Sequence, residues 1–115
     1  MAQPLTSCWP GECCAAVSLT FDDGSPSQLT RAVPMLNDAD LQGTFYLNPR
    51  GDDFLKKLAP WREVAQAGHE IGNHTIAHTC SRAFQRQPAA RGLENMTVAD
   101  VEKDIAEAKR RLQQV

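Results

Sequence analysis

Two groups of ionisable side chains in this sequence have the types and spacing that chemistry requires. In "VSLTFDDG", Asp22 and Asp23 follow a run in which apolar and polar residues alternate. This alternation predicts a β-strand, with the two carboxylates at its carboxyl end pointing to different sides. In "GHEIGNHTIAHT", His74 and His78 are four residues apart, a spacing that puts both imidazoles on the same side of a helical turn. Two imidazoles and one carboxylate form a ligand set that metal ions use when they keep open positions for water or substrate.

The divergence of the aspartate pair predicts two different roles at one place. One carboxylate would bind the ion, and the other would face the bound water as a general base. The alternative is a solvated turn with solvated loop histidines, because Asp and Gly are common turn residues. The combination of the two motifs favours the metal site. His69 precedes His74 by an odd number of residues and so faces the other side of a continuous strand. We therefore expect a structural role for His69, and we assign no chemistry to Glu70.

The elements that must position these residues alternate between strand and helix. We expect strands at residues 17–21, 43–48 and 69–74, helices at Ser25–Leu36, Pro60–Gly68 and Thr97–Leu112, and a long loop at 79–96. Thr97 and Asp100 resemble a capping box at the start of the last helix. This order predicts an α/β fold of parallel strands covered by crossover helices. Three such units in 115 residues have the density of a β/α barrel, whose eight units take about 250 residues.

Composition excludes several classes of partner. The net charge of -2 and a pI near 5.9 argue against nucleic acid or an anionic membrane surface as a ligand. No apolar run approaches the ~20 residues of a membrane span, and the start "MAQPLTSCWPGECC" lacks the features of a signal peptide. These features predict a cytoplasmic location by default. The four cysteines, Cys8, Cys13, Cys14 and Cys80, are expected to be reduced thiols without a chemical role.

Several segments together resemble a known family. "SLTFDDG" and "NHTIAH" resemble the first two motifs of the polysaccharide deacetylase family, the NodB-homology domain of carbohydrate esterase family 4. "GTFYLN" is similar to the second strand of that family, and "GLENMTVADVEKDIAEAKRRL" to the helix that follows its histidine motif. The resemblance covers roughly residues 16–113 and implies an irregular β/α barrel. On this basis we expect an extension at residues 1–15, then the N-terminal portion of such a barrel at 16–115.

The resemblance also implies roles for particular residues. Asp22 would be the catalytic base, Asp23, His74 and His78 the metal ligands, and Thr75 a hydrogen-bonding support of the histidine loop. The implied function is a metal-dependent hydrolase that removes acetyl groups from N- or O-acetylated carbohydrate by attack of a metal-bound water. The expected substrates are chitin-like, peptidoglycan-like or xylan polymers. The expected cofactor is one divalent ion, zinc first, with cobalt, nickel, iron or manganese as alternatives for two nitrogens and one oxygen.

Departures from the family pattern keep two alternatives open. The family's later motifs supply an Arg near the base, oxyanion donors and a His that acts as general acid. We expect these motifs to be absent from this chain, because no His follows His78. The alternatives are a non-catalytic metal-binding remnant and an amidase of the same fold that acts on a small C–N substrate. A sheet of only three strands would also leave open edges, which predicts self-association or pairing with another chain.

Overall fold

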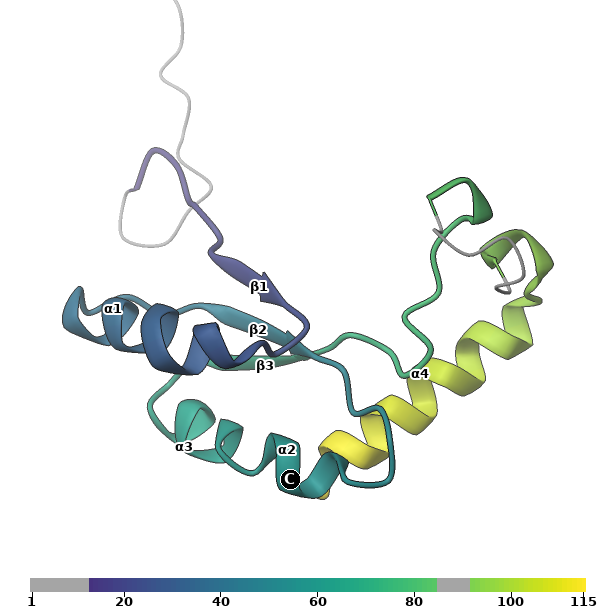
Figure 1. Cartoon of the computed structure of the whole chain (residues 1–115). Coiled ribbons are helices and arrows are strands. Elements are labelled where there is room, and N and C mark those ends of the chain that lie inside the picture. The colour runs from purple at the N-terminus through teal and green to yellow at the C-terminus, as the bar shows by residue number, and fades with distance from the viewer. Residues whose placement is uncertain (1–12, 85–91) are drawn as a thin grey trace, which may run out of the picture.

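A computed structural model describes residues 13–84 and 92–115 of the chain. Three parallel strands, β1 (Thr20–Asp22), β2 (Thr44–Leu47) and β3 (Glu70–Asn73), form one sheet in the order β1-β2-β3 (Figure 1). The other elements are the π-helical turn Gln28–Ala32, the α-helices α1 (Val33–Asp38), α2 (Phe54–Leu58), α3 (Trp61–Gln66) and α4 (Val98–Leu112), and the 3₁₀ turns Arg82–Phe84 and Leu93–Asn95. The predicted parallel α/β architecture is confirmed.

One face of the sheet carries the hydrophobic core. Phe21, Phe45 and Ile71 are register partners on neighbouring strands, so their side chains form a row on that face. The ring of Phe45 is fully buried, with its centroid 4.9 Å from that of Phe21 and 5.1 Å from that of Trp61. The buried core residues are Val33, Leu36, Phe45, Leu47, Leu58, Trp61 and Val64. Because these residues come from β2, α1, α2 and α3, all three helices pack on the same face.

The opposite face of the sheet is polar and largely open. Thr44 and Glu70 are register partners there, and the Thr44 hydroxyl donates to Glu70 Oε2 over 2.6 Å. Glu70 thus contacts the neighbouring strand. The ring of Tyr46 lies against its register partner Gly72, where any side chain would collide with the ring. Asp22 is the β1 partner of Tyr46 and is exposed on this face.

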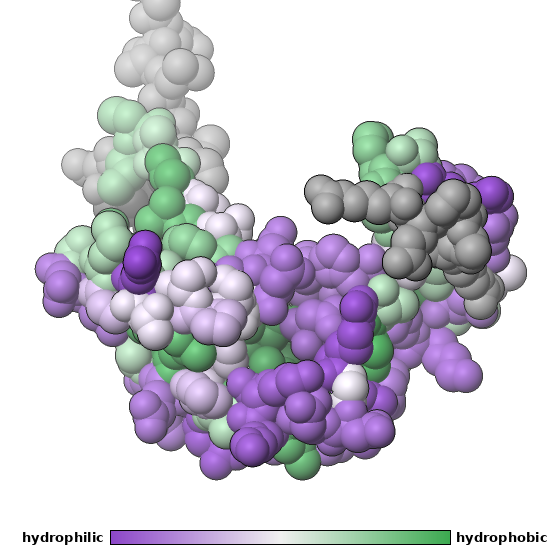
Figure 2. Space-filling view, viewed as in Figure 1, coloured by the Kyte–Doolittle hydropathy of each residue, from purple (hydrophilic) through white to green (hydrophobic). Residues whose placement is uncertain are grey.

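The first strand is shorter than the sequence pattern predicted. It begins at Thr20, and Val17 is 85% exposed, so Val17 does not contribute to the apolar face. Figure 2 shows the resulting apolar surface over the segment that leads into β1. The first strand is short because its neighbour, β2, does not extend further toward its amino end. β2 begins at Thr44, whose N–H donates to the Leu19 carbonyl over 2.9 Å, and Leu19 is itself partly exposed.

The helices differ from expectation where prolines occur. Residues 26–38 are helical without a break, and the Val33 N–H donates to the Gln28 carbonyl, five residues back. This wider turn directly precedes Pro34, which lacks the N–H that a regular helix would use. The helix expected at Pro60–Gly68 is shorter, and α2, which was not predicted, precedes it. The predicted α4 is confirmed, with both arms of the capping box present.

His69 is buried between strand and helix, with only 4% of its surface exposed. The Gly43 N–H donates to its Nδ1 over 3.1 Å, which places the ring proton on Nε2. Nε2 in turn lies 3.1 Å from Asn37 Oδ1, and the ring packs edge-on against Phe45. Both nitrogens of His69 are therefore satisfied inside the fold, which agrees with the structural role expected for this residue.

We predict that His69→Leu destabilises the fold by about 1–3 kcal/mol, because the buried Gly43 N–H loses its acceptor. Urea denaturation followed by circular dichroism measures the effect. The matched variant His69→Gln keeps a carbonyl acceptor and should lose less. Equal unfolding midpoints for wild type and His69→Leu would contradict the structural role.

Candidate metal centre

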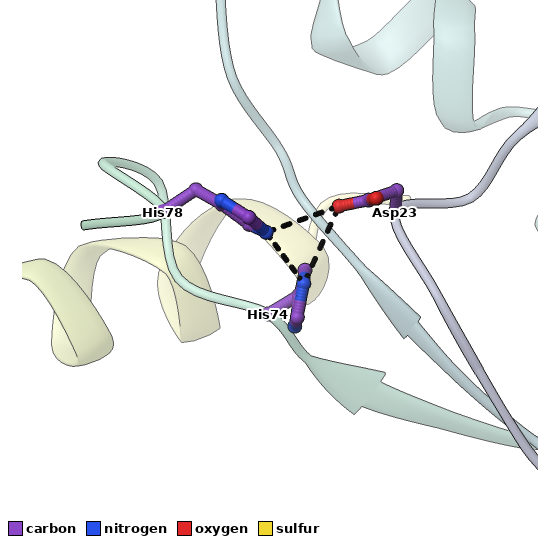
Figure 3. A group of neighbouring side chains, drawn as sticks. All are labelled: Asp23, His74 and His78. Atoms are coloured by element: carbon purple, nitrogen blue, oxygen red, sulfur yellow. Dashed lines mark hydrogen bonds and ion pairs between the residues drawn. The ribbon is translucent and has the colours of Figure 1, made fainter. Parts of the chain in front are cut away.

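Asp23, His74 and His78 converge at the carboxyl end of the sheet (Figure 3). Asp23 Oδ1 lies 3.3 Å from His74 Nε2 and 3.2 Å from His78 Nε2. The two Nε2 atoms are 2.9 Å apart. Three donor atoms from segments 51 residues apart thus form a nearly equilateral triangle.

The triangle has the dimensions of a set of donors that share one ion. Donors about 2.0–2.1 Å from a metal, at angles between octahedral and tetrahedral values, are separated by about 2.9–3.4 Å. The side chains of Asp23, His74 and His78 are 64%, 24% and 47% exposed, respectively, so the open side of the triangle faces solvent. Two imidazole nitrogens and one carboxylate oxygen therefore fit a divalent cation that keeps positions for water or substrate.

The aspartate reaches the site through a turn at the end of β1. Asp22 is the last residue of the strand, and Asp23 and Gly24 both adopt left-handed backbone conformations with φ of 73° and 64°. A Cβ on Gly24 would lie 2.9 Å from Leu47 Cδ2, so this position requires glycine for space as well as conformation. The two carboxylates are therefore directed by the turn rather than by strand alternation alone. In the described residues no ion pair joins the Asp22 carboxylate to the other three side chains.

The histidines reach the site through a loop, and the expected helical turn is wrong. The His74 N–H donates to the Leu47 carbonyl over 3.0 Å and so extends the pairing of β2 with β3 by one residue. The loop then leaves helical geometry, because Thr75 and His78 have φ of 58° and 49°. The Asn73 side chain favours this path by accepting the Thr75 N–H over 2.8 Å. A tight loop, not a helical turn, thus brings the two imidazoles together across their four-residue spacing.

Thr75 supports this loop with its side chain. Its Oγ1 accepts the His78 N–H over 3.1 Å and so joins the residue after the first ligand to the second ligand. This is the kind of contact that the family resemblance implied for Thr75.

The sequence analysis missed three side chains that bind the histidine loop. Asn48 Nδ2 donates to the carbonyls of His74, Thr75 and Ile76, the shortest bond being 2.7 Å. Arg50 donates to the Ile76 and Ala77 carbonyls. Asp104, on α4, accepts the N–H groups of the same two residues. The position of Asn48 directly after β2 was a usable signal, because carboxyl ends of parallel strands share one edge. Nothing in the pattern of α4 distinguished Asp104.

Helix α4 is anchored to the β2–α2 connection by Arg111. Its Nη1 donates to the Pro49 and Gly51 carbonyls over 3.2 Å, and its guanidinium lies 5.2 Å from the centroid of the Phe54 ring. Hydrogen bonds from Arg110 and Arg111 lower the pKa of Glu107 to about 2. Because this folded-state pKa is lowered, any stabilisation from these bonds is present above the ordinary value of 4.5 and fades as the pH falls toward 2.

Two hollows flank the triangle of ligands. One, of about 320 Å³, includes Asp23, Asn48, Arg50 and Phe54 in its lining, and the other, of about 240 Å³, is lined in part by His74 and His78. A larger hollow of about 400 Å³ lies at the amino-terminal end of the strands, and among the described residues that line it Glu70 alone is ionisable. The candidate chemistry is therefore at the carboxyl edge, where parallel α/β folds assemble their sites.

Comparison with known proteins shows the family of this chain. The sequence matches the family model for polysaccharide deacetylases over residues 11–115, and the chain belongs to that family. YheN of Bacillus subtilis strain 168, provisionally named a polysaccharide deacetylase, is 33% identical over 90 residues, which are 77% of this chain and 30% of that protein. A peptidoglycan-N-acetylglucosamine deacetylase of Bacillus cereus is 34% identical over 65 residues, 56% of this chain and 23% of that protein.

Solved structures agree on the fold. The structure of a T48 deacetylase with substrate superposes with a TM-score of 0.62 at 22% identity, covering 86% of this chain and 43% of that chain. The chain thus spans less than half the length of each of these relatives and corresponds to part of their barrel-type domain. No helix in residues 13–84 or 92–115 is both long enough and apolar enough to cross a membrane.

We predict that Thr75→Val accelerates hydrogen exchange of the His78 amide about fivefold, because a net hydrogen bond contributes about 1 kcal/mol. Valine keeps the β-branched shape but removes the acceptor. Thr75→Ser, which keeps the hydroxyl, serves as the control. Amide exchange measured by NMR at residues 74–78 reports the result, and equal rates in Thr75→Val and Thr75→Ser would show that the contact contributes nothing.

Proposed function

We propose that Asp23, His74 and His78 bind one divalent cation and that this centre belongs to a deacetylase of N- or O-acetylated carbohydrate. The observation that carries the proposal is the triangle of donor atoms, with sides of 2.9, 3.2 and 3.3 Å. Zinc is the first choice of ion, because two imidazoles and one carboxylate make up a common catalytic zinc site. Cobalt, nickel, iron and manganese accept the same ligand set.

The chemistry divides between the ion and one side chain of this protein. When bound, a divalent ion lowers the pKa of a coordinated water and polarises a carbonyl oxygen. Asp22 lies one residue before Asp23 at the carboxyl end of β1 and is exposed on the open face of the sheet. We assign it the role of general base, which accepts a proton from the attacking water. In the described residues its carboxylate is not one of the three donors of the triangle, so it is available for this role.

The relatives and the surface of the site support a proposal for the substrate class. One relative is named for deacetylation of N-acetylglucosamine in peptidoglycan, and the family for polysaccharides. The hollows on either side of the ligands, of about 320 and 240 Å³, offer room for sugar units that flank an acetylated one. We propose an acetylated, chitin-like or peptidoglycan-like carbohydrate as substrate. An amidase acting on a small C–N substrate would prefer small amides in the same panel of substrates.

The histidine content favours a second candidate, a metal-binding chain with little turnover. The chain has three histidines, of which two are proposed ligands and His69 is buried with both nitrogens bonded. No imidazole of this chain is left to protonate the leaving amine.

We predict that the wild-type chain binds one equivalent of zinc and that His78→Ala and Asp23→Asn weaken binding at least 100-fold. Asp22→Asn should keep affinity within about threefold, because its carboxylate is not a ligand. Isothermal titration calorimetry measures all four proteins, and elemental analysis after dialysis checks the stoichiometry. Asp38→Asn, at the exposed end of α1, is the control for a lost carboxylate. Loss of zinc in Asp22→Asn, or full affinity in Asp23→Asn, would reverse the two assignments.

We predict weak deacetylation of a chito-oligosaccharide by the zinc-loaded 115-residue chain, because we expect the oxyanion donors of the family's later motifs to be absent from it. Loss of one such donor typically lowers the rate roughly 10²–10³-fold. Any hydrolysis that is present should disappear in Asp22→Asn. Release of acetate, followed by a coupled assay, is the measurement. Turnover at ordinary enzyme rates would show that other groups of this chain supply the acid and the oxyanion donors, and would exclude the low-turnover candidate.

A further inference from the structure

Two of the three residues between the proposed histidine ligands, Ile76 and Ala77, have both their N–H and their carbonyl groups bound by side chains from other elements. Asp104 Oδ1 accepts the N–H of Ile76 over 3.2 Å and that of Ala77 over 3.1 Å, and Oδ2 accepts the latter over 3.2 Å. Arg50 donates to the carbonyls of the same residues, from Nε to Ile76 over 3.0 Å and from Nη2 to Ala77 over 2.9 Å. An anion thus faces the N–H groups and a cation faces the carbonyls, which is the favourable orientation for each.

This clamp acts on a loop that its own residues disfavour. Thr75 and His78 both adopt left-handed backbone conformations, with φ of 58° and 49°. Such conformations are sparsely populated by non-glycine residues, and least by β-branched ones, and they persist where surrounding structure determines them. In the described residues, the local side-chain bonds of this segment are to the Thr75 N–H, which Asn73 Oδ1 accepts, and to the His78 N–H, which Thr75 Oγ1 accepts, so neither reaches Ile76 or Ala77. The loop therefore depends on partners from other elements for its path between the two ligands.

The two clamping side chains come from segments that are themselves fixed. Asp104 lies on α4, next to Ile105, whose carbonyl accepts Asn73 Nδ2 over 3.0 Å at the end of β3. Arg50 lies two residues after Asn48, in the connection that Arg111 of α4 binds through the Pro49 and Gly51 carbonyls. Because the helix and the connection are fixed, the bonds from Asp104 and Arg50 hold the loop in one position.

We infer that Asp104 and Arg50 are positioning residues that set the separation of His74 and His78, so that metal affinity depends on α4. This inference rests on the proposed metal site. Side chains that orient metal ligands through hydrogen bonds typically change affinity 10–100-fold when they are removed. Here the bonds reach the backbone between two ligands, so their loss displaces one imidazole relative to the other.

The test compares Asp104→Ala with Glu102→Ala, which removes an exposed carboxylate from the same helix. Zinc titration of the full chain should show 10–100-fold weaker binding for Asp104→Ala and a change within twofold for Glu102→Ala. Arg50→Lys keeps the charge but loses the planar fork that reaches the two carbonyls, and should also bind zinc at least fivefold more weakly, whereas Arg31→Lys should not. Asp104→Asn, which keeps one acceptor oxygen, replaces Asp104→Ala if that variant does not fold.

A second readout needs no metal. In the metal-free chain, NMR should show faster exchange of the Ile76 and Ala77 amides and shifted ring resonances of His78 in Asp104→Ala, with unchanged spectra for residues of the core. Unchanged zinc affinity in Asp104→Ala, in a chain whose wild type binds zinc, overturns the positioning role and leaves the metal site standing. Failure of the wild type to bind zinc overturns the metal site itself, and the dependence of affinity on α4 with it. Unchanged amide exchange overturns the clamp in either case.

Discussion

The parallel pairing of β1, β2 and β3 is the constraint on which the candidate site depends. Each strand is followed at once by a residue of the site: Asp23 after β1, Asn48 after β2 and His74 after β3. The pairing even continues past β3, since the His74 N–H bonds to the Leu47 carbonyl. Neighbouring parallel strands are about 4.8 Å apart, so the first and third strands are close enough for side chains at their ends to meet. A change of register would separate these residues.

The hydrophobic core holds this pairing and reaches the site directly. Phe45 on the central strand packs against Phe21 on the neighbouring strand β1 and against Trp61 on α3. Gly24, in the turn that presents Asp23, lies against Leu47 and Trp61, with no room for a side chain. The turn is thus packed on the same core that fixes the sheet.

The histidine loop is held by polar contacts, whereas the turn that presents Asp23 is held by apolar packing. Thr75 and His78 are partly or largely exposed, and local support for their left-handed conformations comes from the Asn73 side chain and the Thr75 hydroxyl. Its carbonyls bond to Asn48 and Arg50, and two of its amides bond to Asp104. Backbone groups that are satisfied from both sides restrict a loop without covering it, so the ligands can stay open to solvent.

The sequence by itself determined the fold class and predicted the three ligand residues of the candidate metal centre, Asp23, His74 and His78. Apolar alternation, helical periodicity and the capping box at Thr97 are local signals, and they predicted the three strands and the helix α4. The Asp-Asp-Gly motif and the paired histidines could be assigned to the same edge, because parallel strands place their carboxyl ends together. These inferences need only the order of the elements and the types of the residues.

Only the tertiary structure decided how the site is built. The extent of β1 depended on where β2 begins, so Val17 lies outside the sheet although it continues the alternating pattern. The approach of His78 to His74 came from a loop and not from a helical turn, because Thr75 adopts a left-handed conformation that no local pattern predicts. Asp104 is one of several acidic residues of α4, and its type alone does not distinguish it from the others. Its carboxylate meets two loop amides only because α4 packs beside the end of β3, and such a contact between residues 27 and 28 positions apart depends on packing that the local sequence does not encode.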